Sequence, residues 1–76
     1  MFLFSGGGGA GLTAREQAVL ALSATGLYVP EVAERLGVTP DVVRESIATA
    51  CLKLGSRSKL EAVMIAARRG LLNQSL

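Results

Sequence analysis

Apolar residues recur at steps of three and four along most of the chain, which is the period of amphipathic helices. Thr13 and Glu16 have capping-box spacing, so a first helix is expected to begin at Thr13 and to stop near Gly26. Pro30 suits the first position of a short second helix, which Gly37 is expected to end. No alternating run bounded by turn residues indicates a strand.

A third helix is expected over residues 40–54, with Thr39 as its N-cap and Gly55 as its stop. Polar and apolar positions alternate along it with helical period, so one side should face inward and the other outward. The residues expected on its inner face are Val43, Ile47, Ala50, Cys51 and Leu54.

Ser58 and Glu61 repeat the capping-box spacing and predict a fourth helix, which Gly70 should terminate. Short connections separate the four helices, so the predicted fold class is all-α. The apolar stripe of the fourth helix is expected to consist of Leu60, Val63, Met64 and Ala67.

The domain is expected to span residues 12–72, because residues 1–11 are rich in glycine and 73–76 form a short C-terminal tail. The glycine-rich composition predicts a flexible tail or linker, either natural or introduced artificially. Met1–Phe4 is apolar, and it is either a docking segment or a remnant without a role.

The composition excludes several classes of site. The 76 residues include no histidine and one cysteine, which excludes a disulfide framework and a Cys/His zinc site. We find no nucleophile with a partner base and no phosphate loop, so we expect neither an enzyme, a metal nor a cofactor. Cys51 is interpreted as a small core residue, with a redox sensor as the alternative. A lone thiol fits a reducing cytoplasm, and no apolar run approaches the ~20 residues of a membrane span.

The second and third helices are joined only by Gly37, Val38 and Thr39. A connection of this length containing glycine is typical of a helix-turn-helix, whose second helix enters the DNA major groove. The distribution of charge agrees with DNA binding. Residues 44–76 carry six of the eight Lys and Arg residues but only two of the six acids. A basic half can meet a polyanion, although an ordinary solvated surface has the same composition.

An ordered set of residues resembles the LuxR/GerE family of helix-turn-helix domains. It runs from Leu12-Thr13-x-Arg15-Glu16-x-x-Val19-Leu20-x-Leu22 through Gly26 and Glu31-Val32-Ala33-x-x-Leu36, then Val43-Arg44-x-x-Ile47, Lys53-Leu54-Gly55, Glu61-Ala62-Val63 and Gly70-Leu71. The resemblance implies a bacterial transcription regulator with a four-helix bundle whose third helix reads double-stranded DNA. It also implies a homodimer, with contacts through the fourth helix at the stripe named above. In full-length members an N-terminal receiver or ligand-sensing domain regulates this unit.

Arg44 stands where the family usually has a basic residue entering the groove, and its fork of donors suits guanine or a phosphate. Lys53 is expected to meet a phosphate or to pair with an acid, and Arg57 to lie close to the DNA backbone. The remaining candidates on or before the third helix are Thr39, Val42, Glu45 and Thr49. A modest number of phosphate contacts makes a dimer advantageous, because pairing doubles them.

Departures from the family pattern keep a second hypothesis open. Glu45 places an acid on the recognition helix, where phosphates repel it, although it can accept from a cytosine amine. The alternative is a protein-interaction module on the same fold, with weak or no DNA binding and another transcription protein as partner. Its apolar docking patch would comprise Tyr28, Val29, Pro30, Val42 and Leu52. On the DNA hypothesis the protein belongs in the cytoplasm, at the bacterial nucleoid.

Overall fold

The computed structural model describes residues 11–72, and this part of the chain contains four helices and no strand. The helices are α1 (Ala14–Ala24), α2 (Val29–Leu36), α3 (Pro40–Leu54) and α4 (Lys59–Arg68). The predicted all-α four-helix fold is therefore confirmed. The predictions for Met1–Phe4, for the glycine-rich segment up to residue 10 and for the 73–76 tail lie outside the described residues.

Side chains cap three of the helices, α1, α3 and α4, and at α1 and α4 the sequence predicts a capping box. Thr13 Oγ1 accepts from the Glu16 amide at 3.0 Å, and Glu16 Oε1 accepts from the Thr13 amide at 2.8 Å, which completes the capping box of α1. At α4, Ser58 Oγ accepts from the Glu61 amide at 3.1 Å. The Glu61 carboxylate, however, accepts from the Arg57 amide at 2.7 Å, one residue before the expected partner.

The start of α2 differs slightly from the prediction. The helix begins at Val29, so Pro30 occupies its second position, and Tyr28 is the N-cap without a side-chain cap bond. Glu31 Oε1 instead accepts from the Tyr28 amide at 3.0 Å and satisfies a donor that no side-chain cap reaches. The predicted stop at Gly37 is confirmed, because its φ of 69° is the left-handed conformation that glycine adopts without steric cost.

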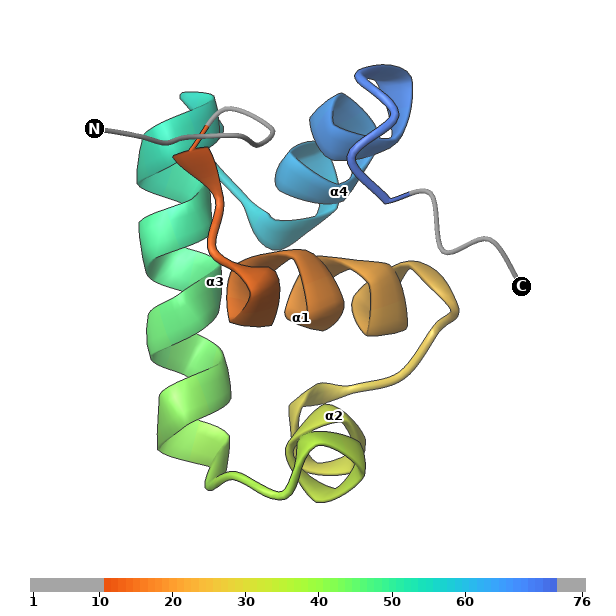
Figure 1. Ribbon diagram of the computed structural model, residues 1–76, viewed down its shortest axis with the longest axis vertical. Coiled ribbons are helices and arrows are strands. Elements are labelled where there is room, and N and C mark those ends of the chain that lie inside the picture. The colour runs from red at the N-terminus through yellow and green to blue at the C-terminus, as the bar shows by residue number, and fades with distance from the viewer. Residues whose placement is uncertain (1–10, 73–76) are drawn as a thin grey trace.

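The helices are arranged around α1. Figure 1 shows α3 running along one side of the molecule and α1 lying across its middle, with α2 and α4 on opposite sides of α1. α1 and α3 each contact all the other helices, whereas α2 and α4 do not touch each other. α3 is thereby held at both of its ends and in its middle. Its side facing away from the other three helices remains uncovered.

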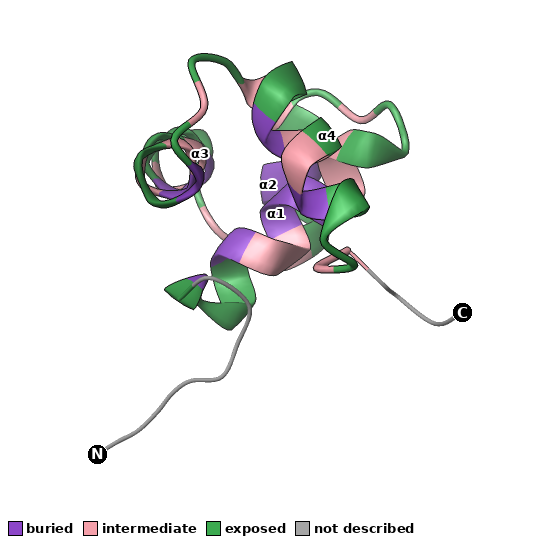
Figure 2. Ribbon diagram, turned by 90° about the horizontal axis from the view of Figure 1, so that it is seen from above, coloured by how far each residue is buried: buried purple, intermediate pink, exposed green. Residues whose placement is uncertain are grey.

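The core consists of two clusters of buried aliphatic side chains that meet at α1. The α2 cluster joins α1 and α2 to the first half of α3 through Val19, Val32, Ala33 and Val43. The α4 cluster joins α1 and α4 to the second half of α3 through Leu12, Leu20, Ala50, Leu54, Ala62 and Ala66. Adjacent residues of α1, Val19 and Leu20, are both fully buried and serve different clusters. Figure 2 shows the buried residues gathered where these helices face each other.

The inner face of α4 is not the predicted stripe. Leu60 and Met64 are 68% and 52% exposed, and Ala67 is exposed too. Ala62 and Ala66 are instead completely buried against α1 and α3, because an alanine side chain allows two helices to approach closely. Of the predicted stripe, Val63 alone packs partly against the core. The stripe is therefore an outer apolar face rather than a core face.

Candidate nucleic-acid interface

The uncovered side of α3 is the candidate interface. Val43, Ala50 and Leu54 are buried as predicted, and residues about 180° round the helix from them turn outward. We call this exposed surface the reading face, and it consists of Asp41, Arg44, Glu45, Ala48 and Leu52. Such a surface along a helix of 15 residues is long enough to lie in a DNA major groove.

The turn before α3 fixes where the reading face begins. Gly37 takes the left-handed conformation, and Val38 then packs against the α2 cluster at the corner between the helices. Thr39 is the N-cap of α3, and its hydroxyl accepts from the Val42 amide at 3.3 Å. Thr39 is predicted to contact DNA, and the residue is exposed. Its hydroxyl, however, already caps the helix.

Charges on the reading face are mixed. Arg44 Nη1 lies 2.9 Å from Asp41 Oδ1, one turn earlier, and both side chains are largely in solvent. Glu45 is exposed beside them. Two carboxylates thus accompany a single guanidinium at the start of the helix, where the positive end of the helix dipole favours acids.

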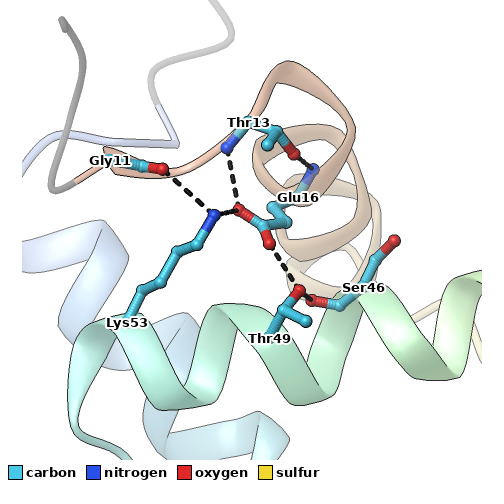
Figure 3. A network of polar contacts seen from close by, with 6 residues as sticks. All are labelled: Gly11, Thr13, Glu16, Ser46, Thr49 and Lys53. Atoms are coloured by element: carbon cyan, nitrogen blue, oxygen red, sulfur yellow. Dashed lines mark hydrogen bonds and ion pairs between the residues drawn. The ribbon is translucent and has the colours of Figure 1, made fainter. Parts of the chain in front are cut away.

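Thr49 and Lys53, both predicted to contact DNA, lie on the flank of α3 beside α1 rather than on the reading face, with Thr49 half-buried and Lys53 exposed. Both turn toward α1, where they meet the carboxylate of Glu16 (Figure 3). Lys53 Nζ donates to Glu16 Oε1 at 2.9 Å and to the Gly11 carbonyl at 3.2 Å. The Thr49 hydroxyl donates to Glu16 Oε2 and lies 3.1 Å from the Ser46 carbonyl of its own helix. Of the two roles expected for Lys53, the structure therefore shows the pairing with an acid.

Glu16 is a charged group in a nearly closed environment, with 4% of the residue exposed. Burial alone raises the pKa of the Glu16 carboxyl, but donors on α3 and on the chain before α1 act in the opposite direction. The hydrogen bonds from Thr49, Lys53 and the Thr13 amide, with the charge of Lys53, leave the pKa below its ordinary value. The carboxylate is therefore ionised at neutral pH and paired inside the fold.

The other predicted DNA-contacting residues flank the reading face. Val42 is half-buried and Arg57 is exposed in the connection between α3 and α4. An open groove separates the start of α1 from α3. It is lined by Thr13, Ala14, Arg15, Glu16, Val42, Glu45, Ser46 and Thr49.

Within residues 11–72, no group of three or more potential ligands is placed to hold a metal ion. Cys51 is half-buried, packs against the α4 cluster and directs its thiol at the Ser58 carbonyl, 3.6 Å away. This environment agrees with its interpretation as a small core residue. None of the described helices has the length and apolar character needed to cross a membrane.

Two residues of this region were not assigned a role at the site from the sequence. Asp41 was not among the candidate residues, although its spacing of three from Arg44 is that of neighbours on a helix. Glu16 was expected only to cap α1, and its partners on α3 are more than 30 residues away in the chain. No local pattern indicates contacts of that kind.

Comparison with known proteins identifies the arrangement. Residues 10–66 match the family model GerE, described as bacterial regulatory proteins of the luxR family. The chain is 39% identical over 59 residues to the response regulator RamR of Streptomyces coelicolor, covering 78% of this chain and 29% of that protein. It also resembles a solved structure described as the phage VqmA-DPO complex, with a TM-score of 0.77 and 29% identity over 87% of this chain and 30% of the other.

The chain thus spans less than a third of the length of either protein. Its four helices, the glycine turn before α3 and the family match all concern the same region, from the start of α1 into α4. Domains of this family bind DNA in transcription regulation. The chain therefore belongs to the luxR family of bacterial regulatory proteins and has the four-helix, helix-turn-helix fold of its DNA-binding domain.

Proposed function

We propose that this chain binds specific double-stranded DNA sequences by placing α3 in the major groove, in the manner of a helix-turn-helix regulator. The observation that supports this function is the reading face, an uncovered helix surface that directly follows the Gly37 turn. Arg44 would contact base edges or a phosphate, while Glu45 would accept from a cytosine amine. Val42 and Arg57 would lie at the margins of the contact. A DNA partner implies a place in the cytoplasm, at the nucleoid.

Selection of bound duplexes from a random pool, at low and at moderate salt, tests this function. A sequence-specific domain enriches a defined motif, and its affinity for that motif falls less steeply with salt than its affinity for random DNA. If no duplex were retained even at low salt, the proposal would be overturned.

We further propose that two copies pair through α4. Leu60 and Met64 are large apolar residues more than half exposed, and Ala67 extends the same outer face. A second copy of this chain would cover the face and present two reading faces to two half-sites. Pairing would also double the number of phosphate contacts, and a domain with few cations gains much from that.

The second candidate function, a protein-interaction module, draws support from Leu52 and Tyr28, which are 82% and 73% exposed. The patch expected for it is not continuous, because Val42 and Leu52 lie ten residues apart on α3, about 15 Å along the axis. A docking partner would therefore use Leu52 or Tyr28 separately. Absence of binding to every duplex, together with retention of the fold, is the result that favours this function.

A further inference from the structure

The carboxylate of Glu16 links α1 to α3 through side-chain hydrogen bonds and an ion pair. It receives three donors, and two of them, Thr49 and Lys53, stand one turn apart on α3 (Figure 3). Because both donors meet the same carboxylate, α3 cannot rotate about its own axis or slide along α1 without breaking one of them. The network thus fixes the direction in which the reading face points.

The same network determines what Lys53 can contact. A lysine ammonium has three donor positions, and Lys53 uses two of them, on Glu16 Oε1 and on the Gly11 carbonyl. Its side chain is 36% exposed, so solvent reaches it, but its charge is already matched by a neighbouring carboxylate. One donor position is left over, but a DNA phosphate could become the counter-charge of Lys53 only by taking the place of Glu16.

That exchange is unfavourable. The Glu16 side chain is 6% exposed, and removing one partner of a buried ion pair leaves an uncompensated charge behind. A phosphate at the protein surface, by contrast, remains in water and can find other cations. The carboxylate of Glu16 therefore competes successfully with DNA for Lys53.

We propose that Glu16 is a positioning residue for sequence recognition, which holds α3 through Thr49 and keeps Lys53 away from the DNA backbone. This inference rests on the proposed DNA-binding function. Its consequence is that Lys53, a basic residue on the recognition helix, contributes orientation rather than phosphate affinity. Loss of the Glu16 charge would free Lys53 and loosen α3, so binding to any sequence would strengthen while discrimination would weaken.

The salt dependence of DNA binding shows whether Lys53 orients α3 or contacts a phosphate. We suggest measuring fluorescence anisotropy with the full chain over a salt series, on a duplex selected by the parent and on a scrambled duplex of equal composition. A residue that meets one phosphate contributes about 1 to the slope of log affinity against log salt. Circular dichroism melting of each variant verifies that it is folded.

For Lys53→Met, we expect an unchanged slope on both duplexes and a loss of affinity confined to the selected one. For Glu16→Gln, we expect the slope on the scrambled duplex to steepen by about 0.9 per protomer as Lys53 reaches a phosphate. The ratio of the two affinities should fall by about tenfold. Lys59→Met, the same substitution at a lysine outside the network, provides the matched control for loss of one positive charge.

Thr49→Val keeps the inference testable if Glu16→Gln does not fold, because it removes one donor and leaves Lys53 paired. It should lower the affinity ratio without changing the slope. If the slope of log affinity against log salt dropped by about 1 in Lys53→Met on both duplexes, Lys53 would contact a phosphate. That result would overturn this inference but not the DNA-binding function. Failure of the parent to bind either duplex would overturn the DNA-binding function and this inference together.

Discussion

Arg44 and Asp41 form an ion pair across one turn of α3, with the guanidinium 2.9 Å from the carboxylate. The Asp41 side chain is 94% exposed and that of Arg44 61% exposed, so the pair lies on the surface that would meet DNA. Ion pairs of this kind contribute about 0–1 kcal/mol to stability, because water screens both charges. Their larger effect here is on the net charge of the reading face.

Replacement of Asp41 should therefore strengthen DNA binding. In Asp41→Asn the reading face loses a carboxylate that repels phosphates, and Arg44 loses a competitor for its donors. We expect tighter binding to selected and to scrambled duplexes, by about 1 kcal/mol or less. Anisotropy titration at constant salt measures the change, with Glu34→Gln, an exposed acid on α2, as the control. Weaker binding of Asp41→Asn would indicate instead that Asp41 orients Arg44 for its contact.

Arg44 itself should carry sequence discrimination. We expect Arg44→Ala to weaken binding to the selected duplex by about 1–3 kcal/mol, which is the range for a bidentate contact to a base. The effect on a scrambled duplex should be much smaller. Arg35→Ala removes an exposed arginine of α2 and should leave discrimination unchanged. Equal losses on both duplexes in Arg44→Ala would assign this residue to the phosphate backbone.

Acid should destabilise the fold through Glu16. Its pKa in the folded protein is lowered, so its contribution to stability is complete above the ordinary pKa of an unfolded glutamate. That contribution is lost as the pH falls through the folded value, because protonation then removes the charge that Lys53 and Thr49 bind. Thermal melting from neutral pH down to about pH 3 measures this loss.

Glu16→Gln has no carboxyl to protonate at this position and should therefore have a flatter dependence of melting temperature on pH over the acidic range. At neutral pH it should melt below the parent, because Lys53 loses its counter-charge. If the melting temperatures of the two proteins fell equally with pH over the acidic range, other carboxylates would be responsible for the acid sensitivity.

The outer face of α4 should control pairing of two copies. Leu60→Gln combined with Met64→Gln should shift the protein toward monomer, because both residues are exposed and apolar. Sedimentation equilibrium measures the association. The melting temperature extrapolated to low concentration should change little, since neither residue belongs to the core. Leu52→Gln, at a more exposed apolar residue of α3, is the control and should leave association as it was.

Local signals predicted the boundaries of the helices well, because caps and stops are properties of neighbouring residues. The Thr13 capping box and the left-handed Gly37 are examples, and both are present in the structure. The inner face of α4 was not predicted, for a physical reason. Leu60 and Met64 are more hydrophobic than Ala62 and Ala66, but the close approach of α4 to α1 and α3 leaves room for alanine side chains.

The candidate site, too, was predicted only in part. The reading face follows from helical period alone, and Arg44 and Glu45 are exposed as expected. Thr49 and Lys53 are also predicted to contact DNA, but the carboxylate of Glu16, distant in the chain, accepts hydrogen bonds from both. A buried carboxylate outweighs solvent as a partner for a nearby lysine, and sequence spacing carries no information about that encounter.

The two clusters of the core share α1, yet no helix contact joins α2 to α4. Both clusters also contain buried residues of α3, so the first half of the reading face rests on the α2 cluster and its second half on the α4 cluster. Mutations in the α2 cluster can therefore accumulate without repacking the support of α4. A lineage with this fold can thus change the start of the reading face without disturbing α4, whereas a change in the α4 cluster affects both the end of the reading face and the pairing surface.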